Sequence, residues 1–205
     1  MAETTPADGT EGPGTAAGSG AEPWTFASLA AASRDTLEQV LLDSTAPDYS
    51  KLEGYIYCGW NHEWVAIISG RKFKKGFRRK DGQTLGYNEI VHQDNAGYEG
   101  EWRVRMKDGR PRQLGYFRCS LIADEPPQPL FRPYQHTGHF DYSVPMNRGI
   151  HLPFRVIRDF VVLPNAGDHS LMLCKAYFQL GFRRLNIFYC YFLLGHREPI
   201  EHEPW

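Results

Sequence analysis

Three long apolar runs lie one after another between Phe154 and Gly195, and they limit the folds open to this chain more than any other feature. The runs are Phe154–Leu163, Leu171–Leu180 and Leu185–Leu194, separated by short segments that contain glycine and polar residues. Runs of about ten residues rich in Val, Ile, Phe and Tyr, joined in this way, are typical of long antiparallel strands in a meander. The end of the chain therefore predicts three sequential strands of one sheet.

Shorter apolar runs before residue 125 continue this pattern and lack a helical period. Asp-Gly pairs at Asp81-Gly82 and Asp108-Gly109 are among the strongest local signals for a hairpin turn. We expect about six strands here and a further one at 138–143, at the roughly ten-residue spacing typical of a sandwich or barrel. The six runs are Leu52–Gly59, Glu63–Ser69, Lys72–Arg79, Leu85–Val91, Glu101–Met106 and Gln113–Ile122.

The remaining segments predict a single domain over residues 24–205, preceded by a tail. Residues 1–23 are mainly Ala, Gly, Thr, Pro and Glu without periodicity, so we expect them to be disordered. Residues 24–43 have apolar residues at helical spacing and predict one helix or two short ones, with Thr25 or Ser28 and then Ser33 as candidate N-caps. Residues 125–153 contain six prolines and predict a long irregular loop, a type of segment that often binds ligands.

Alternate positions of the last runs are apolar on both faces, which predicts strands buried on both sides. Such strands favour an all-β fold: a closed, antiparallel up-and-down barrel of about 8–10 strands. Its outer wall would be covered by the N-terminal helix or by a partner chain, which leaves a homodimer open. A two-sheet β-sandwich is the alternative.

An N-terminal helix followed by an up-and-down run of strands resembles the architecture of lipocalin-type barrels. The Gly-x-Trp signature of that family is not present, because Gly59-Trp60 lacks the intervening residue. The resemblance therefore implies a lipocalin-like architecture and no particular activity.

Composition limits the cellular location and the classes of partner that we expect for this protein. A net charge of −1 gives no electrostatic reason to expect a nucleic acid or an acidic membrane surface as partner. No apolar run reaches the ~20 residues of a membrane-spanning helix, and no secretory signal is recognisable. The cysteines (Cys58, Cys119, Cys174 and Cys190) lie in strand-like runs and predict reduced, buried thiols, hence a cytoplasmic location; a Cys174–Cys190 disulfide is the alternative.

Three cations lie among large apolar neighbours within the predicted strands: Arg158, Lys175 and Lys75. A charge in such surroundings needs a partner, and cations that face a barrel interior can find one in a ligand. We therefore expect the barrel to bind a small hydrophobic or amphiphilic molecule with an anionic head group. Further candidates for polar groups in this site are Tyr177, Tyr87 and Asn88.

Three other interpretations stay open. Arg158 can instead face water or pair with a core carboxylate such as Asp141, Glu89 or Glu53. The barrel can be an isomerase, cyclase or lyase in which Lys175 or Tyr177 transfers protons while Arg158 holds a carboxylate, and a cavity-facing group with a strongly shifted pKa would favour this. A protein-interaction module with a filled barrel is the third, favoured if no cavity reaches ~300 Å³.

The remaining motifs give weaker predictions about function. The basic run 71–80 has aromatic residues suited to stacking on bases, but alternate cations on a hairpin are more often a solvated strand face, so we expect no nucleic-acid partner. His136, His139, Asp141 and His151 are residue types that bind metals, at spacings that match no known signature, so we expect no metal. No nucleophile elbow or glycine-rich phosphate loop occurs, and no cofactor is expected.

Overall fold

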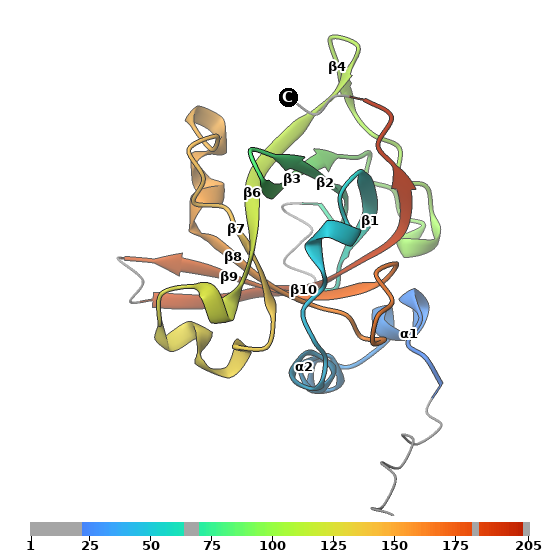
Figure 1. The fold of residues 1–205 in the computed structure, drawn as a ribbon. Helices are drawn as coiled ribbons and strands as arrows, with labels where there is room; N and C mark the ends of the chain where they lie inside the picture. Colours follow the sequence, from blue (N-terminus) through green and yellow to red (C-terminus); the bar gives the residue numbers. More distant parts are fainter. Residues whose placement is uncertain (1–21, 64–69, 182–184, 203–205) are drawn as a thin grey trace, which may run out of the picture.

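The computed structural model describes residues 22–63, 70–181 and 185–202. Within them, eight strands form a closed antiparallel barrel (Figure 1). The strands are β1 (Tyr55–Asn61), β2 (Lys72–Lys80), β3 (Gln83–Ile90), β6 (Gln113–Leu121), β7 (Gly138–Asp141), β8 (Ile157–Val162), β9 (Met172–Leu180) and β10 (Leu185–Pro199). Each pairs with the next along the chain, and β1 with β10 closes the ring. The predicted up-and-down barrel is confirmed, and the sandwich is excluded.

Two of the expected strands differ from the structure. The predicted run 154–163 begins as the 3₁₀ helix η6 (Gly149–Val156), because Pro153 lies within it and cannot donate to a ladder. In the predicted run 101–106 only Met106 belongs to a strand. It lies in β4 (Met106–Lys107), which pairs with β5 (Arg110–Pro111) as a hairpin that projects beyond the barrel in Figure 1. The predicted strand 63–69 lies outside the described residues apart from its first position.

The Asp-Gly turns have the backbone that their sequence predicts. Asp81 and Gly82, between β2 and β3, have φ values of 51° and 78°. A type I′ turn needs positive φ at both central residues, and Asp followed by Gly tolerates this conformation better than most pairs. The turn sets the β2–β3 register, in which Lys75 lies opposite Asn88.

Side chains of the barrel form two separate cores because both faces of the late strands are covered. The inner core is largely aromatic and includes Tyr57, Phe77, Phe117 and Phe140. The outer core lies between the barrel wall and three covering segments, α1 (Phe26–Ala30), α2 (Arg34–Asp43) and the 3₁₀ helix η5 (Pro129–Tyr134). Figure 1 shows α1 and α2 below β9 and β10. The expected N-terminal helix is therefore two helices that cover the outer wall.

Local sequence explains why these covering segments form. Thr25 caps α1 in a reciprocal capping box with Ser28, and the Ser33 side chain caps α2 by accepting from the amide of Thr36. The proline-rich segment is more regular than expected, because it contains η5, β7 and η6. It buries Leu130 and Phe131 in the outer core.

All four cysteines are buried and free, so the alternative of a Cys174–Cys190 disulfide is wrong. Among the residues that the structure describes, no helix has the length and apolar character needed to cross a membrane.

Candidate ligand-binding site

A cavity of about 280 Å³ lies inside the barrel, near the end where β1, β3, β7 and β9 finish. Its wall is mostly aromatic and aliphatic, and includes Phe73, Phe154, Ile157, Phe178, Tyr189 and Phe192. The opposite end is filled by aromatic rings, with the Phe77 centroid 5.6 Å from that of Tyr57 and 5.8 Å from that of Phe117. The volume falls slightly short of ~300 Å³, which is the lower end of the range for small-molecule pockets and the limit below which the sequence interpretation favours an interaction module. The barrel is therefore solid at one end and hollow at the other.

A bulge in β10 shapes one wall of this cavity. The register of β10 against β9 shifts between Phe188 and Cys190, which leaves Tyr189 as an extra residue. As a result Tyr189 and Cys190 both line the cavity, whereas Tyr191 packs in the outer core. Strict alternation along β10, as expected from the sequence, places Tyr189 and Tyr191 on the same face and is wrong at this point.

Four polar side chains meet at the cavity wall, contributed by β2, β3, β8 and the residue after β7. Lys75 Nζ donates to Asn88 Oδ1 at 2.9 Å and to Tyr142 Oη at 2.6 Å, and lies 3.7 Å from Asp159 Oδ2. Tyr142 Oη in turn donates to Asp159 Oδ2 at 3.0 Å. The tyrosine hydroxyl therefore bridges the ammonium and the carboxylate.

Burial makes this cluster electrostatically unusual. The side chains of Lys75 and Asp159 are only 1% and 3% exposed. Burial lowers the pKa of Lys75 and raises the pKa of Asp159, and the attraction between the two charges opposes both changes. The Lys75 ammonium also lies 4.3 Å from the centroid of the Phe117 ring, where a cation–π contact compensates part of its lost hydration.

The structure brings together two of the six residues predicted for the site. Lys75 and Asn88 line the cavity. Arg158 and Lys175 face the outer wall instead, so their predicted inward orientation is wrong. Their neighbours in sequence, Asp159 on β8 and Ala176 on β9, are the residues that line the cavity. The apolar neighbours of both cations belong to the outer core, which is as well covered as the inner one.

Lys175 is held between the barrel wall and α2. Its Nζ donates to Glu38 Oε2 and to Tyr134 Oη, each at 2.7 Å. The Tyr191 hydroxyl donates to the same Glu38 oxygen. Burial raises the pKa of Glu38, but the hydrogen bonds from Lys175 and Tyr191 outweigh burial and lower it overall. This cluster attaches α2 to the barrel.

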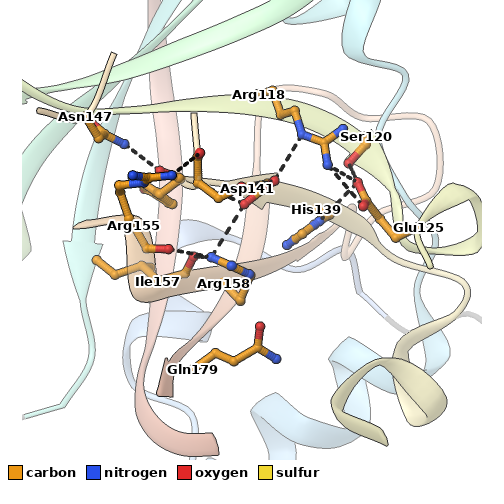
Figure 2. Close-up of polar contacts among 12 residues, drawn as sticks. Arg118, Ser120, Glu125, His139, Asp141, Asn147, Arg155, Ile157, Arg158 and Gln179 are labelled. Carbon is orange, nitrogen blue, oxygen red and sulfur yellow. Dashed lines mark hydrogen bonds and ion pairs between the residues drawn. The ribbon is translucent and has the colours of Figure 1, made fainter. Parts of the chain in front are cut away.

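Arg158 belongs to a second cluster on the outer wall (Figure 2). Its Nη1 donates to the carbonyls of Arg155 and Ile157 at 2.9 and 2.7 Å and lies 3.5 Å from Asp141 Oδ1. Arg118 Nε donates to the other oxygen of Asp141 at 3.0 Å. Arg158 thus pairs with a core carboxylate, which is the structural alternative considered from the sequence.

The two predicted tyrosines also lie outside the cavity. The Tyr177 hydroxyl is 3.3 Å from that of Tyr134 in the outer core. Tyr87 packs over Gly76, where an added Cβ would lie 2.4 Å from the tyrosine ring. Its ring centroid is 6.5 Å from that of His202 in the C-terminal segment.

The histidine-rich segment and the basic run take part in structural contacts. His136 Nε2 lies 3.0 Å from the Leu41 carbonyl, and His139 Nδ1 lies 3.6 Å from Glu125 Oε1. No group of three or more His, Cys, Asp or Glu side chains in the described part of the chain is placed to hold a metal ion. In the basic run, Lys72 pairs with Asp94 at 2.7 Å and Lys74 pairs with Glu198.

Sequence reasoning missed Asp159 and Tyr142 as members of the site. Asp159 lies on the strand face opposite Arg158, and that face is the inner one. A signal was present: Asp159 lies between Arg158 and Phe160 in a strand with apolar residues on both faces, so it needed a buried partner as much as Arg158 did.

No protein-family model, curated protein or solved structure matches the chain.

Proposed function

We propose that the barrel binds a small, mostly apolar molecule in the cavity, with the polar end of the molecule at the Lys75–Asp159 cluster. One observation carries this proposal: an apolar cavity inside the closed barrel, with a buried polar cluster in its wall. Small-molecule sites characteristically combine apolar walls with a few placed polar groups.

A purely structural role explains this cluster poorly. Replacement of a buried ion pair by apolar residues of similar volume is often neutral or stabilising, because removing two charges from water is costly. The filled end of the same barrel shows that aromatic side chains can pack this lumen without any charge. Polar groups that break the local packing rule are expected at functional sites.

The orientation of the cations changes the expected ligand. With Arg158 and Lys175 turned outward, Lys75 is the one cation among the described residues that line the cavity, and Asp159 lies beside it. The pair carries no net charge. An anionic head group, expected from the sequence, therefore has much less support than an apolar molecule with a neutral polar end.

A proton-transfer enzyme is the second candidate. The specific observation in its favour is that both shifted groups, Lys75 and Asp159, face the cavity. In that case Asp159, with its pKa raised by burial, is the candidate proton acceptor. Lys175, Tyr177 and Arg158, expected to have these roles from the sequence, do not line the cavity.

Titration with N-phenyl-1-naphthylamine, a neutral dye that fluoresces in apolar surroundings, tests the proposal. We expect saturable binding to the wild-type protein and at least about a tenfold loss of affinity in Ala176→Phe, whose ring fills the cavity. Ala27→Phe adds the same ring on exposed α1 and is the control. Equal dye affinity in both variants, with melting temperatures near that of the wild type, would contradict the proposal.

A further inference from the structure

We infer that the polar group of the ligand is an uncharged hydrogen-bond donor, such as the hydroxyl of a phenol or alcohol, and that Asp159 Oδ1 accepts its hydrogen bond. This inference rests on the proposed function, because it concerns the same cavity. It adds a binding residue and a class of ligand.

The two carboxylate oxygens of Asp159 differ in their partners. Oδ2 accepts from Tyr142 and faces the Lys75 ammonium, whereas Oδ1 has no hydrogen-bond partner among the described residues. Asp159 is 2% exposed and lines the cavity. An unsatisfied buried acceptor destabilises the folded protein, and more so when it is charged. A donor brought by the occupant of the cavity relieves this cost.

The other polar side chains described at this wall have partners within the protein. Lys75 has three N–H groups, and they face Asn88, Tyr142 and Asp159. The Asn88 amide donates to the Gly115 carbonyl at 2.8 Å. The Asn61 amide donates to the Gly70 carbonyl at 2.8 Å, and its oxygen lies 3.6 Å from Cys190 Sγ. A ligand acceptor would compete with these partners, whereas a ligand donor finds Asp159 Oδ1 without one among the described residues.

The charges at the cavity wall also favour an uncharged donor as the polar group of the ligand. A carboxylate or phosphate in the cavity would lie next to Asp159, and the Lys75 charge is already compensated by that residue. A like charge in a low-dielectric site disfavours binding strongly. The site therefore selects a neutral donor over an anion of the same shape.

Three naphthalene derivatives with nearly the same body test this selection by displacement of the dye at pH 7. They are 2-naphthol, which is a neutral donor at this pH as tyrosine is, 2-methylnaphthalene, which neither donates nor accepts, and 2-naphthoate, an anion. We expect 2-naphthol to bind about tenfold more tightly than 2-methylnaphthalene, because its hydrogen bond goes to a charged acceptor. We expect 2-naphthoate to bind most weakly of the three.

The variant Asp159→Asn tests whether Asp159 causes the preference for 2-naphthol. This change leaves the Lys75 ammonium without a carboxylate, so we expect the advantage of 2-naphthol to shrink and 2-naphthoate to gain affinity relative to the wild type. Asp124→Asn makes the same chemical change at an exposed position of the 3₁₀ helix η4 (Ile122–Asp124) and is expected to keep the wild-type order. If Asp159→Asn does not fold, the order of the three compounds on the wild-type protein decides alone.

The outcomes separate this inference from the proposed function. If the dye binds but 2-naphthol and 2-methylnaphthalene displace it equally, or 2-naphthoate displaces it best, the donor inference is overturned and the proposed function stands. If neither the dye nor any naphthalene binds, the proposed function itself fails. If the wild-type order persists in Asp159→Asn, Asp159 is not the acceptor.

Discussion

Lys75 and Lys175 are two buried lysines on the same barrel, one on its inner face and one on its outer face, and their surroundings are closely matched. The Lys75 side chain is 1% exposed and contacts Tyr142 and Asp159, and the Lys175 side chain is 8% exposed and contacts Tyr134 and Glu38. Aromatic rings lie near both ammonium groups. The carboxylates differ, because Asp159 is 3% exposed at 3.7 Å whereas Glu38 is 33% exposed at 2.7 Å.

This difference indicates what each cluster does. On the outer wall the ion pair is short, its carboxylate is partly hydrated, and one partner comes from a helix that must be attached to the barrel. Inside the barrel both partners come from the barrel itself, and one carboxylate oxygen has no partner in the described part of the chain. The outer lysine therefore has a complete structural explanation within the chain. Beside the inner lysine, Asp159 Oδ1 has no such explanation among the described residues.

The largest stability effect is expected on the outer wall. Glu38→Gln leaves the Lys175 ammonium buried without a counter-charge, and we expect a loss of about 3 kcal/mol in the free energy of unfolding at pH 7, measured in urea. Because the folded-state pKa of Glu38 is lowered, its stabilisation is present above the ordinary pKa of the carboxyl and is lost as the pH falls. The difference between Glu38→Gln and wild type should accordingly shrink in acid. A constant difference from pH 7 into acid would mean that charge is not its cause.

An intermediate effect is expected inside the barrel. In Lys75→Met the Asp159 carboxyl loses the cation that lowers its pKa, so the pKa of Asp159, already raised by burial, rises further. The group can then take up a proton, which limits the loss to about 1–2 kcal/mol at pH 7.

The direction of the pH dependence follows from the raised pKa of Asp159. Stabilisation by Asp159 is fully present below its ordinary pKa of 3.8 and is lost as the pH rises through the folded-state value. Lys75→Met should therefore recover stability relative to the wild type as the pH falls from 7 to 5. A loss of more than about 3 kcal/mol that does not depend on pH would place the inner pair in the same structural class as the outer one.

The fold could be predicted from the sequence because its signals are local. Apolar runs, Asp-Gly turns and the caps at Thr25 and Ser33 each specify their own few residues, and the barrel follows from their order. Single residues account for the exceptions. Pro153 shortened β8, and a bulge at Tyr189 changed which face of β10 points inward.

The site was predicted only in part, because alternation gives two faces and does not say which is inside. Lys75 lies on the inner face with Phe73, whereas its neighbour Lys74 pairs with Glu198 on the other face. For Arg158 the neighbours were apolar on both faces, so burial alone could not separate the lumen from the outer core. The decision depends on Glu38 and Asp141, carboxylates on α2 and β7 whose proximity in space no spacing in the sequence reveals.

The smallest effects are expected from a matched pair of Tyr→Phe changes, and they give the most direct test of the comparison. Tyr134→Phe and Tyr142→Phe each remove one hydroxyl bonded to a buried lysine, and we expect each to cost about 1 kcal/mol of stability. Only Tyr142 lines the cavity. Tyr142→Phe should therefore bind N-phenyl-1-naphthylamine about threefold more tightly, because the wall becomes more apolar, whereas Tyr134→Phe should leave the dye affinity unchanged. Equal changes in dye affinity would mean that the dye does not distinguish the lumen from the outer wall, and the functional difference between the two lysines would be lost.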